Sequence, residues 1–167
     1  ATQILKQDGC MKGTYQLAGV PREFIQNCVV GGRVMLRNNK KQHVKARYCN
    51  KRKTMCYIQD YDACSLYPSA MNRMNGTIRG KPKIITNFNK KWLDDCADYY
   101  FVEINITKLT KKRQFPLISI IEENGLRTFT NDVVGHNIYC DKTMLDDWIK
   151  YQGIDFEIIR GYYYDEG

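Results

Sequence analysis

The chain of 167 residues carries 26 lysines and arginines against 18 aspartates and glutamates, a net charge of +8. This length allows one domain with a hydrophobic core, or part of a larger protein. No apolar run is long enough for a membrane-spanning helix, and the chain does not begin like a signal peptide. We therefore expect a soluble, intracellular protein that makes no contact with a membrane.

The cysteine and histidine patterns argue against zinc. The seven cysteines are odd in number and form no Cys-x-x-Cys pair, which is typical of free thiols in a reducing compartment. We expect these thiols to be unpaired and mostly buried. His43 and His136 have no histidine or cysteine at ligand spacing, so we interpret both as surface or hydrogen-bonding residues.

The first predicted element is a helix from Pro21 to Cys28, with Phe24, Ile25 and Cys28 on one side. A β-like run follows at residues 29–35. Its paired glycines, Gly31 and Gly32, favour a bulge or the close approach of another backbone.

A basic segment follows the two glycines, and residues 38–53 are typical of an exposed hairpin or loop. Residues 33–53 contain nine cations and no acid: Arg33, Arg37, Lys40, Lys41, Lys45, Arg47, Lys51, Arg52 and Lys53. Such a run indicates contact with phosphate backbones, because lysine and arginine there displace condensed counterions. A plain solvated basic loop is the alternative.

The central stretch combines a carboxylate with the start of a helix. β-favouring residues predict a strand over 54–61, and Pro68 suits the first turn of a helix that continues to Met74. Asp62 lies between the two elements. Carboxylate and carbonyl oxygens are ligands that Mg²⁺ accepts together with substrate phosphates, and backbone N–H groups at a helix start favour anions. The segment is therefore a candidate site for a metal and a polyphosphate. Burial of its tyrosine and leucine is the alternative.

The rest of the chain alternates short strands and turns. Alternation of apolar residues predicts a strand over 98–107, and Asn124-Gly125 predicts a type I′ hairpin between 116–121 and 126–129. Between them, the cluster Lys111-Lys112-Arg113 is either a phosphate contact or an exposed turn. The predicted fold class is α+β, with mostly antiparallel strands and a few short helices.

The final predicted elements are a strand over 137–140, a helix and a last strand. Thr143 and Asp146 form a weak capping box for the helix, whose apolar face is Leu145, Trp148 and Ile149 and which ends at Gly153. The last strand begins at residue 154 and runs into tyrosines 162–164. We expect these tyrosines to serve in packing more than in stacking on bases.

The stretch Asp62-x-x-Ser65-Leu66-Tyr67-Pro68-Ser69 resembles motif A of the family B DNA polymerases. The resemblance implies that Asp62 is catalytic and holds metal together with the carbonyl of Ala63. It also implies that the backbone N–H groups of Ser65 and Leu66 hold an incoming deoxynucleoside triphosphate (dNTP), and that the Tyr67 ring lies under its sugar. Asp60 is a weaker candidate for assisting the metal site.

The wider arrangement is similar to the protein-primed branch of that family. Gly31-Gly32 resembles its Tyr-x-Gly-Gly element, although Val29 stands where the tyrosine is expected. The resemblance implies DNA contact by Gly31 and Gly32, and the basic run adds four residues to the predicted DNA-binding set: Arg33, Arg37, Lys40 and Lys41. It also implies three segments, which are the end of an upstream exonuclease-like domain or a linker from it (1–28), the start of a polymerase palm (29–80) and a terminal-protein-region-like insertion (81–167).

Two further motifs of the family, Lys-x-x-x-Asn-Ser-x-Tyr-Gly and Asp-Thr-Asp, are absent from the sequence. The resemblance therefore implies a fragment of a DNA-directed DNA polymerase, inactive alone. Its parent would use two Mg²⁺ ions to add dNTPs to a primer hydroxyl on template DNA or on a terminal protein. The alternatives are a non-catalytic basic module that binds DNA or protein, and a degenerate polymerase relic.

Overall fold

A computed structural model describes residues 3, 7 and 14–166. The contacts of the chain divide it into two compact units, residues 33–75 and residues 1–32 with 76–167. We call the first the motif unit and the second the sheet unit, and each is described by itself. These units have other boundaries than the three predicted segments, since residues 19–28 pack in the same unit as residues 81–166.

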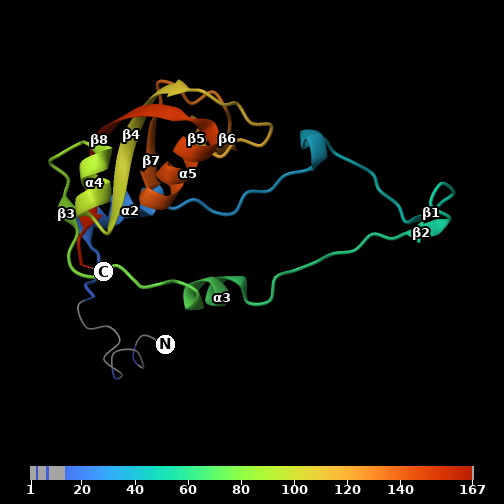
Figure 1. The fold of residues 1–167 in the computed structure, drawn as a ribbon, viewed down its shortest axis with the longest axis horizontal. Helices are drawn as coiled ribbons and strands as arrows, with labels where there is room; N and C mark the ends of the chain where they lie inside the picture. Colours follow the sequence, from blue (N-terminus) through green and yellow to red (C-terminus); the bar gives the residue numbers. More distant parts are fainter. Residues whose placement is uncertain (1–2, 4–6, 8–13, 167) are drawn as a thin grey trace. The chain divides into compact units, whose positions relative to one another are not determined.

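The sheet unit is built on a four-stranded antiparallel sheet in the order β3-β8-β4-β7 (Figure 1). Its long central strands are β4 (Tyr99–Leu109) and β8 (Ile154–Tyr164), and its edges are β3 (Lys83–Ile84) and β7 (Asn137–Asp141). The predicted α+β class with antiparallel strands is confirmed, as are the strands expected at 98–107, at 137–140 and from 154.

Two helices cover one face of this sheet. Leu93 of α4 (Lys90–Cys96) and Leu145 and Trp148 of α5 (Lys142–Gln152) are buried against it. The facing side chains of β4 alternate along the strand and are fully buried: Tyr100, Val102, Ile104 and Ile106. The alternating apolar side chains of the strand and the apolar faces of the two helices therefore pack together in one core.

Helix α2 (Gly19–Cys28) covers the other face, as its predicted apolar side requires. Phe24 and Cys28 are buried against Phe101 and Tyr164. The Phe24 ring also meets the rings of Tyr139 and Tyr162 edge to face, at centroid distances of 5.1 and 5.2 Å. Such edge contacts add to the gain from area burial. Tyr162 and Tyr164 therefore serve in packing, as expected.

The N-terminus of α5 corrects the predicted cap. Asp141 is the N-cap residue, and its Oδ1 accepts a hydrogen bond of 2.8 Å from the backbone N–H of Met144. The predicted Thr143 lies inside the helix instead. The helix ends as predicted at Gly153, which is left-handed (φ 59°) and donates its N–H to the carbonyl of Ile149.

A small hairpin pairs β5 (Ser119–Ile121) with β6 (Arg127–Phe129), where a hairpin was predicted. Its turn is not type I′, because Gly125 has a positive φ (81°) and Asn124 does not. The N–H of Gly125 bonds to the carbonyl of Glu122, and the N–H of Glu122 to the carbonyl of Leu126. This is a three-residue loop whose left-handed glycine makes a bulge.

The motif unit contains a short 3₁₀ helix η1 (Arg37–Asn39), a hairpin of β1 (Arg47–Cys49) with β2 (Thr54–Cys56), and helix α3 (Leu66–Asn72). The β-like run expected at 29–35 has no regular structure. None of the side chains described in residues 33–75 is buried. In the part of the chain that the structure describes, no helix has the length and apolar character needed to cross a membrane.

Candidate functional site

The segment around Asp62 is more irregular than its sequence predicts. Strand β2 ends at Cys56, and residues 57–63 form no strand. The strand predicted over 54–61 therefore stops five residues early, at Cys56. β-favouring residue types do not hold a strand when no neighbour completes the ladder, and here β1 pairs only as far as Cys56. Asp60, Asp62 and Ala63 are all exposed to solvent.

Helix α3 begins where the sequence predicts a helix, with Pro68 as its third residue. Its N-cap residue, Ser65, lies in the left-handed region at φ 46° and ψ 50°. The carbonyl of Ser65 accepts a hydrogen bond of 2.9 Å from the N–H of Ser69. A left-handed conformation at a residue other than glycine costs about 1–3 kcal/mol and concentrates at functional sites.

The side chains that follow the bend are exposed to solvent. Leu66 is 59% exposed and Tyr67 is 76% exposed. The predicted nucleotide-binding residues Ser65, Leu66 and Tyr67 are consecutive, and they lie three to five positions after Asp62. The structure therefore gathers the predicted catalytic, metal-binding and nucleotide-binding residues on one exposed bend of the motif unit.

The metal donors on this bend are oxygens. Asp62 supplies a carboxylate and Ala63 a carbonyl, which are ligands that suit Mg²⁺. Among the described residues, no group of three or more histidines, cysteines, aspartates or glutamates is arranged to hold a metal. The bend therefore offers one carboxylate and one carbonyl as oxygen donors, which by themselves do not complete a metal site.

The predicted DNA-binding residues are exposed throughout. This holds for the whole set: Gly31, Gly32, Arg33, Arg37, Lys40 and Lys41. The glycine pair does not make the close backbone approach that was expected, because a Cβ added at Gly31 or Gly32 would meet no atom within 4 Å. No strand or bulge forms there either, so these glycines are not explained by packing within the chain.

The second basic cluster is held by two amide side chains that sequence reasoning did not identify, one of them buried. Gln152, fully buried, accepts a hydrogen bond from Leu117 N–H (2.9 Å) and donates to the carbonyl of Lys111 (3.2 Å) and to Asn131 (3.2 Å). Asn131 also bonds both backbone groups of Arg113. We call Gln152 and Asn131 the amide clamp.

The amide clamp bonds the backbone on either side of Lys112, at Lys111 and Arg113, and all three cations are exposed. The Arg113 guanidinium lies 5.8 Å from the ring centroid of Tyr151, an exposed side chain, and the Lys150 ammonium lies 5.2 Å from the same ring. Fixed cations beside an exposed ring are suited to a polyanion with stacking bases.

The thiols are free, as expected, but most of them are not buried. Six cysteines lie in the described residues and all are unpaired, whereas Cys10 lies outside them. Of these six, only Cys28 and Cys140 are buried. Burial raises the pKa of the Cys28 thiol to about 12, and the charges of Asp141 and Glu103 add to that shift. Cys28 is therefore a packing residue and not a nucleophile.

Comparison of the chain with protein-family models, with curated proteins and with solved structures found no match.

Proposed function

We propose that the chain is part of a DNA-directed DNA polymerase of family B, in the branch that starts replication on a protein primer. The observation that carries the proposal is the spacing of Asp62 from the run Ser65-Leu66-Tyr67-Pro68. This motif places a metal-binding carboxylate, nucleotide-binding N–H groups and an aromatic ring within six residues.

In this proposal, each residue of the bend has its own role. The Asp62 carboxylate and the Ala63 carbonyl would hold Mg²⁺, which would supply charge neutralisation for the triphosphate and activation of the primer hydroxyl. The N–H groups of Ser65 and Leu66 bind phosphate oxygens. The Tyr67 ring lies under the deoxyribose and excludes a 2′-hydroxyl. The exposed cations of the motif unit contact the backbone of the template and primer.

Exposure of the motif supports this proposal over simple packing. A packing role for Leu66 and Tyr67 requires them to be buried, and both are more than half exposed. The left-handed Ser65 adds support, because strain of this kind is retained where a backbone must present its groups in one direction.

Nucleotide binding tests the proposal directly on this chain. We expect dATP to bind in the presence of Mg²⁺, as measured by calorimetry, and Asp62→Ala to abolish the Mg²⁺-dependent part. The matched control is Asp95→Ala, which removes an exposed carboxylate from α4 and leaves binding unchanged. Equal Mg²⁺-dependent binding by the wild type and Asp62→Ala would refute the role of Asp62.

Primer extension tests the expected incompleteness. The chain alone, given primed template, dNTPs and Mg²⁺, should extend nothing, because one carboxylate cannot hold two ions in the required geometry. In a parent protein carrying the two further motifs, Asp62→Ala should abolish synthesis and Tyr67→Val should admit ribonucleotides. Extension by the isolated chain would contradict the view that the catalytic centre needs residues beyond it.

A non-catalytic DNA-binding module is the second candidate function, and the amide clamp favours it. The buried Gln152 holds the backbone beside three like charges in place. Cations held in place suit a protein that binds polyanions and does not catalyse a reaction. If the chain is such a module, its DNA binding weakens steeply as the salt concentration rises. Neither Asp62→Ala nor added Mg²⁺ and dNTP changes that DNA binding. Loss of DNA binding in Lys112→Gln, with no dNTP binding at all, would favour it over the polymerase.

A further inference from the structure

Strand β7 forms an edge of the sheet, because its only pairing partner is β4. The β4–β7 register ends at Asn105 opposite Asn137, and one pair further the Ile106 N–H bonds to the His136 carbonyl (3.3 Å). Antiparallel pairs alternate, so the backbone groups of Ile138 also turn toward β4. Those of Asn137 and Tyr139 therefore turn outward. In the described part of the chain, no strand pairs with this outer edge.

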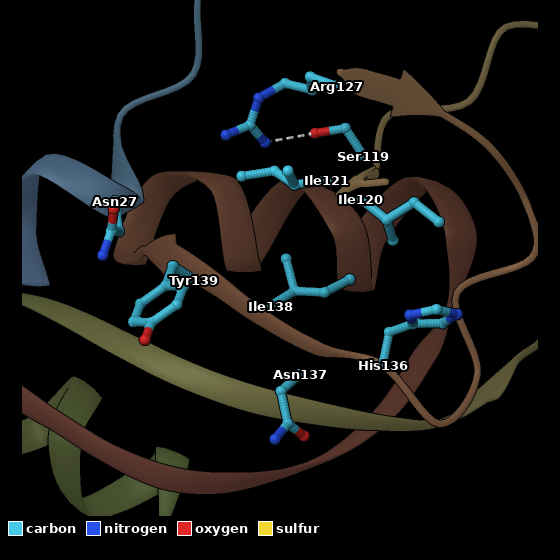
Figure 2. Close-up of a pocket in the computed structure, with 9 residues that line it drawn as sticks. All are labelled: Asn27, Ser119, Ile120, Ile121, Arg127, His136, Asn137, Ile138 and Tyr139. Atoms are coloured by element: carbon cyan, nitrogen blue, oxygen red, sulfur yellow. Dashed lines mark hydrogen bonds between the residues drawn. The ribbon is translucent and has the colours of Figure 1, made fainter. Parts of the chain in front are cut away.

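A cavity of about 220 Å³ lies along that edge, between β7 and the β5–β6 hairpin (Figure 2). Its end is marked by Asn27, the penultimate residue of α2. We call this cavity the edge groove. An unpaired strand edge beside a cavity is the arrangement that lets an incoming peptide add a strand to a sheet.

The lining of the edge groove is apolar with one cationic side. Ile121 and Ile138 supply apolar surface, and Ile121 is 64% exposed. Arg127 pairs with Ile121 across the hairpin, so both side chains lie on the same face of it. The Nη1 of Arg127 donates to the Ser119 hydroxyl at 2.8 Å, which fixes the guanidinium beside the groove (Figure 2).

The charge of the groove has one sign. Arg127 is its cation, and none of its lining residues is an aspartate or glutamate. No ion pair joins Arg127 to a carboxylate within the described residues. A guanidinium with free N–H donors matches a carboxylate in a bidentate pair.

We propose that the edge groove binds an extended, acidic peptide segment of a partner protein, which pairs as a strand with β7. One of its carboxylates binds Arg127, and an apolar side chain near it contacts Ile121 and Ile138. The segment's own backbone bonds to the outward N–H and C=O groups of Asn137 and Tyr139. This site is independent of Asp62 and of the proposed polymerase chemistry.

A random library of displayed heptapeptides, selected against the whole chain, tests the proposal. We expect enrichment of peptides with an aspartate or glutamate among β-branched residues. Their affinity should fall at least tenfold for Arg127→Gln, with Lys91→Gln, an exposed cation on α4, as the unchanged control. Enrichment of no peptide, or of peptides that bind Arg127→Gln equally well, would overturn the proposal.

Two measurements distinguish strand pairing from simple attraction of an anion. Bound peptide should slow hydrogen exchange at the amides of Asn137 and Tyr139, and leave Ile138 unchanged. Peptides N-methylated at alternate amides should lose binding in one of the two patterns and keep it in the other. Equal binding by both patterns would overturn the strand model.

Other occupants give other outcomes, each of which contradicts the proposal. Competition by millimolar acetate as strong as by peptide would mean a free carboxylate site. Displacement of peptide by a DNA oligonucleotide, lost in Arg127→Gln, would mean a phosphate site. Dimerisation in sedimentation that Arg127→Gln abolishes would mean that a second copy of the chain occupies the groove. A native near-ultraviolet circular dichroism spectrum for Arg127→Gln confirms that this variant is folded, which is the control for each of these experiments.

Discussion

The two units differ in how their apolar residues are used. The sheet unit buries both faces of β4 under helices, and fifteen residues, including Leu93, Ile104 and Leu145, form its main cluster. The motif unit leaves its large apolar side chains exposed, among them Val34, Tyr57 and Met71. Burial of apolar area is the main term that offsets conformational entropy. The sheet unit therefore has its own source of stability, and the motif unit does not.

The candidate catalytic and nucleotide-binding residues therefore lie on the less stable of the two units. Helix α3 has seven residues and buries none of them. A helix this short is marginal in water unless an apolar face packs on something. Functional loops are drawn from the low-stability end of proteins because they must move or meet a ligand. The exposed apolar residues of the motif unit are thus available to a substrate or to another protein surface.

The largest expected effect comes from Gly161 in the sheet unit. A Cβ there would lie 2.3 Å from the carbonyl oxygen of Phe101, so Gly161→Val would force β4 and β8 apart. We expect a loss of at least about 3 kcal/mol in the free energy of unfolding, or no folded sheet unit. Urea denaturation followed by circular dichroism measures it. Gly31→Val, where a Cβ meets nothing within 4 Å, is the control.

Matched leucines give the next largest effect. Leu145 is fully buried on α5 and Leu66 is exposed on α3. Leu145→Ala should cost about 2–5 kcal/mol by leaving a cavity, whereas Leu66→Ala should stay within about 0.5 kcal/mol. Both are measured as changes in the urea midpoint at constant slope. A loss for Leu66→Ala equal to that for Leu145→Ala would mean that α3 packs on a surface, and the contrast between the units would be lost.

The amide clamp gives an intermediate effect. Gln152→Leu keeps the volume but leaves Leu117 N–H and the Lys111 carbonyl without their partner. An unpaired buried polar group costs about 1–3 kcal/mol, so the variant should be destabilised by that amount. Amide exchange at Leu117 should quicken by more than the global change. Gln26→Leu, at an exposed position on α2, is the control and should change neither quantity.

The sequence predicts the sheet unit well because its patterns come from burial. Alternation in β4 and the apolar side of α5 identify both elements, since each pattern reflects a side that must leave water. Helix α4 escapes prediction because it is seven residues long and only Leu93 is buried. The cap at Asp141 escapes because Thr143 offers a competing capping pattern two residues later.

The candidate sites also differ in whether local sequence patterns reveal them. The bend at Asp62 can be proposed as a site from sequence because its residues are neighbours in the chain, although the strand predicted before it stops at Cys56 and its role stays a prediction. The amide clamp and the edge groove are not found, because they depend on long-range contacts. Gln152 meets Lys111 across 41 positions, and Arg127 meets the β7 edge only through the packing of the hairpin. Local patterns contain no information on such contacts.

The smallest expected effect concerns Ser65, and it tests whether the bend is strained. Ser65→Gly removes the steric cost of the left-handed backbone at φ 46°, while it also frees the unfolded chain. The gain should therefore be a few tenths of a kcal/mol to about 1 kcal/mol, felt locally in α3. Slower hydrogen exchange of the Ser69 amide, which bonds to the Ser65 carbonyl, measures it. Ala70→Gly, at an ordinary helical position, should quicken that exchange instead. If Ser65→Gly also quickened it, the serine would be unstrained, and the left-handed bend would give no support to a functional site in the motif unit.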